Sequence, residues 1–88
     1  MDILHITPTD TRYTVREALR RTSARQILIV LPWDVEKGWD LPLDFQVLHR
    51  PIYERDLNVA WAVPDPERRA LPKEAGFPVF ESEAAARA

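Results

Sequence analysis

The feature that most constrains the fold of this chain is an uninterrupted apolar run, Ile27 to Leu31, which ends at Pro32. Its residues do not alternate between apolar and polar types, and this indicates a strand that is buried on both faces. Such strands belong to parallel sheets, because the crossover helices of a parallel sheet pack on its faces. The run therefore predicts an α/β fold rather than an antiparallel sheet with one face in water.

Three further strands and three helices are predicted around this run. The strands are expected at residues 3–7, 57–63 and 78–80, and the helices begin near residues 14, 42 and 66. Strands that alternate with helices predict a parallel sheet, here a small three-layer, doubly wound sheet of four strands. We expect the strand order 2-1-3-4, with the first helix on the face opposite to the other two. The alternative order is 3-2-1-4.

Local signals mark the ends of the predicted helices. Thr14 and Glu17 have the spacing of a capping box at the start of the first helix. Asp65 is expected to cap the third helix. Pro51 and Pro72 lie inside the second and third predicted helices, so each of these helices is expected to kink or to divide into short turns.

The chain is expected to be one soluble, cytoplasmic domain. Its 88 residues, of which 45% are hydrophobic, are enough for a single modest core, assigned to residues 1–80. Residues 81–88 are expected to be a tail or the start of a linker. The first residues do not have a signal-peptide pattern, and no apolar run approaches the roughly 20 residues of a membrane span. The absence of cysteine excludes disulfides and thiolate chemistry.

Few residues indicate catalysis or a cofactor. With only two glycines, the chain has neither a P-loop nor a Gly-x-Gly-x-x-Gly motif, so no nucleotide cofactor is expected. Its two histidines do not have metal-ligand spacing. Asp10, Asp34 and Asp65 each follow a predicted strand, and together they could hold Mg²⁺ in a divalent-metal hydrolase. Roles in turns and helix capping compete with that hypothesis.

The carboxyl ends of the strands are also where an open α/β sheet binds small ligands. Thr9, Asp10, Thr11, Arg12 and Asp65 are expected there, beside the amides that open the first helix. These groups favour an anion or another small ligand. The net charge of −2 disfavours nucleic acid, which is usually bound by a basic excess.

The most unusual stretch is the loop of residues 32–40, which carries Trp33 and Trp39 among polar residues. In one hypothesis both indoles fold back over the end of the sheet and join the core. In the other, Trp33, Trp39 and Val35 form an interface, because Trp is enriched in contact hot spots. The interface hypothesis predicts a non-enzymatic assembly or regulatory module that binds a second copy or another segment of a longer protein. A small-ligand or anion sensor is the alternative, and the metal hydrolase is a third possibility.

Residues 65–80 resemble part of an uncharacterised bacterial α/β module. The turn at Leu31-Pro32, the segment 43–55 and the strand 59–63 are similar to other parts of that module, so the resemblance covers residues 3–82. The module usually stands at the N-terminus of longer proteins, many of them membrane-anchored. The resemblance implies no catalytic residues, and it implies that residues 81–88 begin a linker. Pro51, Pro72 and the Trp-bearing loop depart from the module's pattern.

Overall fold

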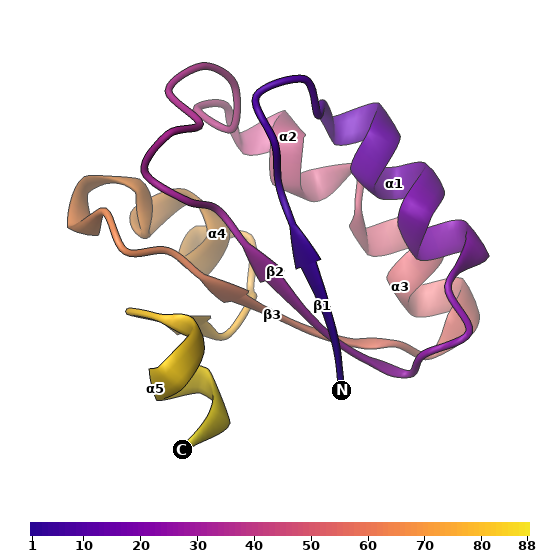
Figure 1. Cartoon of the computed structure of the whole chain (residues 1–88). Coiled ribbons are helices and arrows are strands. Elements are labelled where there is room, and N and C mark those ends of the chain that lie inside the picture. Colours follow the sequence, from indigo (N-terminus) through magenta and orange to yellow (C-terminus); the bar gives the residue numbers. More distant parts are fainter.

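The computed structural model describes all 88 residues and contains one four-stranded sheet whose strands are all parallel (Figure 1). The predicted α/β class is therefore confirmed. The strands are β1 (Asp2–His5), β2 (Gln26–Val30), β3 (Asn58–Ala62) and β4 (Val79–Phe80). The helices are α1 (Arg12–Arg21), α2 (Pro42–Gln46), α3 (His49–Arg55), the 3₁₀ turn η1 (Pro66–Arg68), α4 (Ala70–Glu74) and α5 (Glu83–Arg87).

The strands lie in the order β1-β2-β3-β4, so the predicted order 2-1-3-4 and its alternative 3-2-1-4 are both wrong. The observed order places β2 and β3 in the middle of the sheet, where Leu28, Ile29 and Trp61 have no exposed surface. The order 2-1-3-4 would have put β2, the most apolar strand, at an edge. The edge is taken instead by β1, whose end residues Asp2 and His5 are exposed.

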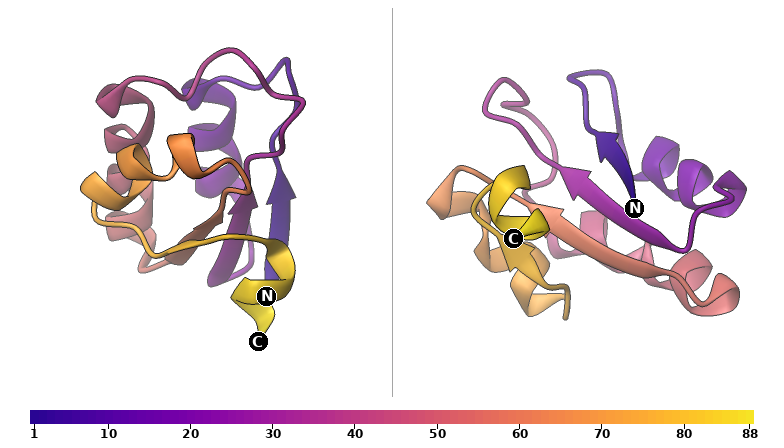
Figure 2. Two further views of the ribbon diagram at one scale, coloured as in Figure 1. Left: turned by 90° about the vertical axis from the view of Figure 1, so that its left-hand side faces the viewer. Right: turned by 60° about the horizontal axis from the view of Figure 1, so that its bottom comes forward.

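Helices α1 to α4 cover one face of the sheet, and α5 lies on the other face (Figures 1 and 2). Each strand is added beside the one before it, so right-handed crossovers place every connecting helix on the same face. The sheet is therefore wound in one direction. It does not have the reversal of strand order that the predicted doubly wound arrangement requires.

The larger core lies between the sheet and helices α1 to α4. Ile27, Ile29 and Leu31 point into it from β2 and its end, whereas Leu28 and Val30 point to the opposite face. The burial of this strand on both faces is as predicted. The other buried residues of the larger core are Ile6, Val15, Leu19, Val35, Trp39, Phe45, Leu48, Leu57, Val59, Trp61, Val63 and Phe77.

The smaller cluster on the opposite face depends on α5. Leu28, Val30 and Ala62 are buried there, and Ala86 of α5 packs against them. Ala60 and Ala62 of β3 belong to this cluster, so small side chains lie on the face that α5 covers. The segment predicted to be a tail thus contains a helix that rests on the sheet.

Both prolines that were expected to interrupt helices do so. The second predicted helix divides into α2 and α3, and Pro51 is the third residue of α3. Likewise η1 separates from α4, and Pro72 is the third residue of α4. The first turn of a helix has no intrahelical acceptor for its N–H groups, so proline does not lose a hydrogen bond there. None of the resulting helices combines the length and the apolar character needed to cross a membrane.

Candidate functional site

The loop between β2 and α2 lies at the carboxyl end of the sheet (Figure 1). Its two tryptophans, which are close together in the sequence, have different environments. Trp39 is only 2% exposed and Val35 only 1%, whereas Trp33 is 64% exposed. Trp39 and Val35 therefore belong to the core, as the folding-back hypothesis predicts for this part of the loop. Of the three predicted interface residues, only Trp33 is open to a partner.

Trp39 is brought to the core by an unusual backbone turn. Gly38 has a φ of 81° and Trp39 a φ of 59°, both in the left-handed region, which few residues other than glycine adopt. The turn directs the Trp39 indole inward, where its ring centroid lies 5.7 Å from that of Phe45 and 5.5 Å from that of Trp61. Aromatic packing at these distances stabilises the turn.

Arg68 holds the same loop from the outside. Its guanidinium donates to the backbone carbonyl oxygens of Val35 and Gly38. These bonds reach the loop from η1, which lies 30 or more residues further along the chain. Because the loop is held by both its buried side chains and its carbonyl groups, Trp33 projects from a fixed segment of backbone.

The turn between β1 and α1 is organised by the Asp10 carboxylate. It accepts hydrogen bonds from the Thr7 amide at 2.9 Å and from the Thr14 hydroxyl at 2.9 Å. Partial burial by itself raises the pKa of Asp10, but hydrogen bonds from the Thr7 amide and the Thr14 and Thr7 hydroxyls outweigh burial. The pKa of Asp10 is therefore below its ordinary value.

The cap of α1 differs from the predicted one. The Thr11 hydroxyl accepts from the amides of Tyr13 and Thr14 at 3.2 and 3.3 Å, so Thr11 is the N-cap and the predicted box of Thr14 with Glu17 is wrong. Thr14 instead completes a capping box with Thr11, because its own hydroxyl accepts from the Thr11 amide at 2.9 Å. The helix gains three residues at its start.

A hollow of about 320 Å³ lies between the start of α1 and the end of the Trp-bearing loop. Arg12 spans it, with Nη1 3.2 Å from Oδ1 of Asp44. The other oxygen of Asp44 accepts from the amides of Asp40 and Leu41 at 3.1 and 3.0 Å. The lining residues are Asp10, Thr11, Arg12, Tyr13, Gly38, Trp39, Asp40, Leu41 and Asp44.

The other predicted site residues lie apart from this hollow. Asp65 caps η1 by accepting from the Glu67 amide at 3.0 Å, and the Thr9 hydroxyl lies 3.1 Å from that of Thr7. Asp10, Asp34 and Asp65 are not gathered into a metal site. Nowhere in the chain are three or more His, Asp or Glu side chains placed to hold a metal ion.

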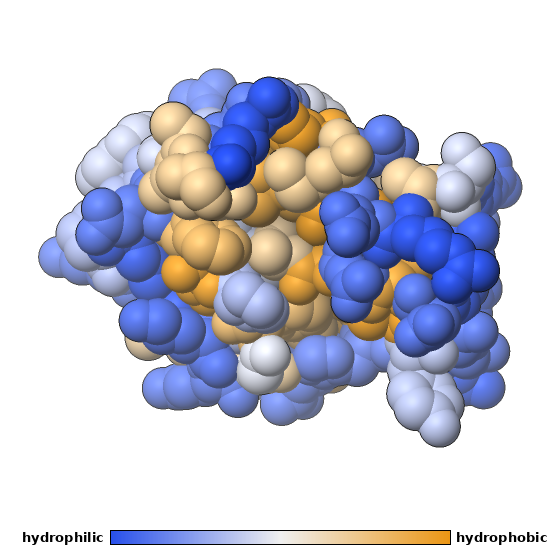
Figure 3. Space-filling view, turned by 90° about the horizontal axis from the view of Figure 1, so that it is seen from below, coloured by the Kyte–Doolittle hydropathy of each residue, from blue (hydrophilic) through white to orange (hydrophobic).

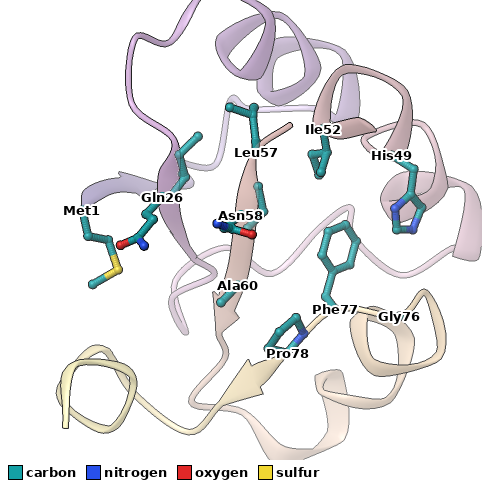
Figure 4. Close-up of a pocket in the computed structure, with 12 residues that line it drawn as sticks. Met1, Gln26, His49, Ile52, Leu57, Asn58, Ala60, Gly76, Phe77 and Pro78 are labelled. Carbon is teal, nitrogen blue, oxygen red and sulfur yellow. The ribbon is translucent and has the colours of Figure 1, made fainter. Parts of the chain in front are cut away.

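A second hollow, of about 390 Å³, lies at the amino ends of β2, β3 and β4. Seen from this end of the sheet, an apolar area crosses the middle of the surface (Figure 3). No local sequence pattern predicts this hollow, which Figure 4 shows in close-up. Its polar residues Gln26 and Asn58 stand side by side only because β2 pairs with β3, and strand order was the part of the fold that was predicted wrongly.

Comparisons with protein-family models, with curated proteins and with solved structures found no significant match for this chain.

Proposed function

We propose that this chain is a non-enzymatic assembly or regulatory module that binds another protein through the carboxyl end of its sheet. The observation that carries the proposal is the exposed indole of Trp33 on a loop held by Val35, Trp39 and Arg68. Because the backbone of this loop is held, less freedom is lost on binding than from a mobile loop, and tryptophan is enriched among the residues that dominate interface energies.

Other large apolar side chains are exposed near this loop. Tyr13, Leu41 and Leu43 are each roughly half exposed, and Tyr13 and Leu41 line the 320 Å³ hollow. We call Trp33, Tyr13, Leu41 and Leu43 together the carboxyl-end surface. Aromatic and aliphatic groups around a small hollow are typical of the core of a protein contact. The hollow itself is lined by three Asp and one Arg. This excess of negative charge favours a partner that inserts a basic side chain.

The anion-sensor alternative has less support. The Thr11 hydroxyl occupies the amides at the start of α1, and Arg12 is paired with Asp44. An anion in the hollow would also lie next to the carboxylates of Asp10 and Asp40. The metal-hydrolase alternative also has little support. The carboxylates of Asp10 and Asp65 already accept hydrogen bonds from backbone amides, in a turn and in a helix cap respectively. We place the module within a longer bacterial protein on the resemblance of residues 3–82 alone.

The test compares Trp33→Ala with Tyr53→Ala. Tyr53 is 89% exposed on α3 and lies outside the carboxyl-end surface, so its truncation is a matched control. Sedimentation equilibrium is expected to show association that weakens at least tenfold in Trp33→Ala and is unchanged in Tyr53→Ala, with equal unfolding midpoints.

A photo-crosslinking amino acid at position 33 or 53 tests for a partner other than a second copy in cells. Position 33 is expected to give a defined adduct that position 53 does not give. A monomeric mass, combined with equal crosslinking from both positions, contradicts the proposal.

A further inference from the structure

Strand β1 forms an open edge of the sheet. It pairs with β2 on one side, and no strand lies along its other side (Figure 2). Figure 4 shows Met1, which precedes β1, and Asn58 of β3 on opposite sides of Gln26 of β2. The other edge of the sheet is β4, which has only two residues and follows Pro78. β1 is therefore the longer of the two edges that another strand can join.

Two residues of β1 turn their backbone groups away from the sheet. The Ile6 amide donates to the Val30 carbonyl oxygen at 2.9 Å, so the backbone groups of Ile6 face β2. Because these groups alternate in direction along a strand, those of Ile3 and His5 face the open side. Neither a loop nor a side chain hydrogen-bonds to them. The open edge thus presents a row of free donors and acceptors.

The middle of β1 lacks the features that protect an edge strand. Natural edges are usually blocked by proline, lysine, a bulge or a covering segment. Ile3 and Leu4 are apolar and half-buried, and β1 pairs with β2 in continuous register. The fixed charge of the strand, Asp2, stands at its start. An edge of this kind is a template for a further strand.

A small hollow of about 140 Å³ lies between this edge and α1. Leu4 lines it from the strand, and Ala18, Leu19 and Thr22 line it from the helix. Leu4 also packs against the larger core, so its side chain points to the helix-covered face of the sheet. Directly opposed side chains of paired strands lie about 4.5–5.5 Å apart. An apolar side chain opposite Leu4 would therefore meet the hollow.

The side of α1 that borders the hollow is balanced in charge. Arg21 lies three positions after Ala18, and Glu17 lies four positions before Arg21, so these side chains are neighbours on the helix. The Arg21 guanidinium is 3.1 Å from the Glu17 carboxylate. Arg12 is engaged elsewhere, with Asp44 of α2. The helix thus offers one acid and one base beside the open edge.

The β1 edge is complementary to itself. In an antiparallel pair, residues with outward backbone groups must meet one another. A two-fold axis at Leu4 places Ile3 of each copy opposite His5 of the other, and all their outward N–H and C=O groups then pair. An axis at His5 would need the amide of Thr7, which already donates to the Asp10 carboxylate. The axis at Leu4 therefore gives the most complete pairing.

The same axis also matches the charges on the two helices. Ala18 and Leu4 line one hollow, so an axis at Leu4 passes near Ala18. The two copies of α1 then run in opposite directions, and Glu17 of each approaches Arg21 of the other. Opposite charges meet across the axis, as a contact between identical surfaces requires.

We propose that the β1 edge binds the β1 edge of a second copy, so that two four-stranded sheets become one continuous sheet. The Leu4 side chains meet at the axis, over the hollows beside α1. The carboxyl ends of the two sheets point in opposite directions, so both carboxyl-end surfaces stay free. The dimer does not depend on the function proposed for those surfaces, and any association through Trp33 is a further step.

The first test measures the mass of the full chain carrying Trp33→Ala, which removes association through the carboxyl-end surface. Sedimentation equilibrium is expected to show a monomer–dimer equilibrium with a dissociation constant of order 10–100 µM. Adding His5→Pro removes an outward N–H but leaves the ladder to β2 intact. This change is expected to weaken the dimer at least tenfold, because the two-fold axis repeats the loss. His5→Ala keeps the N–H and is the matched control, with an expected change of at most twofold.

The second test uses single cysteines, because the natural chain has none. At the axis, Leu4 of one copy faces Leu4 of the other in a non-hydrogen-bonded pair, with Cα atoms about 4.5 Å apart. This separation suits a disulfide, which needs about 4.4–6.8 Å. Leu4→Cys is expected to form a covalent dimer at least tenfold faster than Ile3→Cys, since Ile3 lies opposite His5 rather than opposite itself. Equal unfolding midpoints show that both variants are folded.

The outcomes separate the two proposals. A Trp33→Ala chain that is monomeric at about 1 mM overturns the β1 dimer and leaves the carboxyl-end proposal standing. The dimer is also overturned by equal weakening in His5→Pro and His5→Ala, or by equal crosslinking from positions 4 and 3. If His5→Pro does not fold, the crosslinking rates decide: faster linkage of Leu4→Cys supports the dimer, and equal rates exclude it.

Discussion

Arg12 and Asp44, which are 32 residues apart in the sequence, join the starts of α1 and α2, with Nη1 of Arg12 lying 3.2 Å from Oδ1 of Asp44. The same carboxylate accepts the amides of Asp40 and Leu41, which end the Trp-bearing loop. One largely buried side chain therefore positions α1, α2 and the loop between the sheet and α2. The arrangement of the carboxyl-end surface depends on it.

Replacing Asp44 with Ala is expected to lower the free energy of unfolding by about 2–4 kcal/mol, because three donors lose their acceptor and the Arg12 charge loses its partner. Glu54→Ala is the control, since Glu54 forms an exposed i,i+4 pair with Arg50 that is worth about 0.5 kcal/mol or less. Urea unfolding measures both. Equal losses in the two variants would mean that the buried carboxylate has no special role.

Trp39 and Trp33 are expected to respond very differently to truncation. Trp39→Ala removes a buried indole from contact with Phe45 and Trp61, and we expect a loss of about 3–5 kcal/mol. Trp33→Ala is expected to change stability by about 0.5 kcal/mol or less, because the side chain is exposed. The Trp39 indole N–H is buried without a hydrogen-bond partner, so Trp39→Phe loses packing alone and should cost about 1–2 kcal/mol. Denaturation midpoints that fall in another order would contradict this assignment of core and surface.

The acid stability of the chain is expected to depend on Asp10. Its folded-state pKa is below the ordinary value, so the folded state binds a proton less readily than the unfolded state. The stabilisation is fully present above the unfolded pKa and is lost as the pH falls through the folded pKa. Asp10→Asn is therefore expected to be less stable than the natural chain at pH 6, by about 0.5–1 kcal/mol. The difference should shrink as the pH approaches 2. A difference that stays constant across this range would exclude a role for the charge.

Helix α5 is expected to protect the smaller apolar cluster. Ala86→Asp places a carboxylate against Leu28 and Val30, and we expect a loss of about 1–2 kcal/mol with increased binding of a hydrophobic dye. Ala84→Asp makes the same change at an exposed position near the start of α5, where a negative charge is tolerated. Similar effects of the two variants would show that α5 does not rest on the sheet in solution.

The α/β class could be predicted because it depends on a local pattern, the apolar run from Ile27 to Leu31. The helix breaks at Pro51 and Pro72 were also predictable, since they follow from the missing N–H of proline. The strand order was not, because right-handed crossovers permit several orders. The choice among these strand orders depends on packing across the sheet, such as the pairing of Ile29 with Trp61. No short segment of sequence contains that information.

The candidate sites were predicted only in part, for a similar reason. Trp33 and Trp39 look alike in the sequence, and both stand in a polar loop. They differ in the structure because the backbone turns at Gly38 and because Arg68 binds the loop from a distant segment. Asp10 and Arg12 were expected to be free for a ligand, but both are engaged by neighbouring residues.

The strand order β1-β2-β3-β4 also bears on how the molecule is made. Each strand pairs with the one synthesised just before it, so no strand has to insert between two others. The sheet can grow vectorially as the chain leaves the ribosome, because every new strand meets an edge that is already formed. Each connection between paired strands holds at most two short helices, so partners stay closer in sequence than they would in an order that skips a strand, and a lower contact order favours faster folding. During synthesis, the last unprotected surface is then the face over β2 that α5 closes.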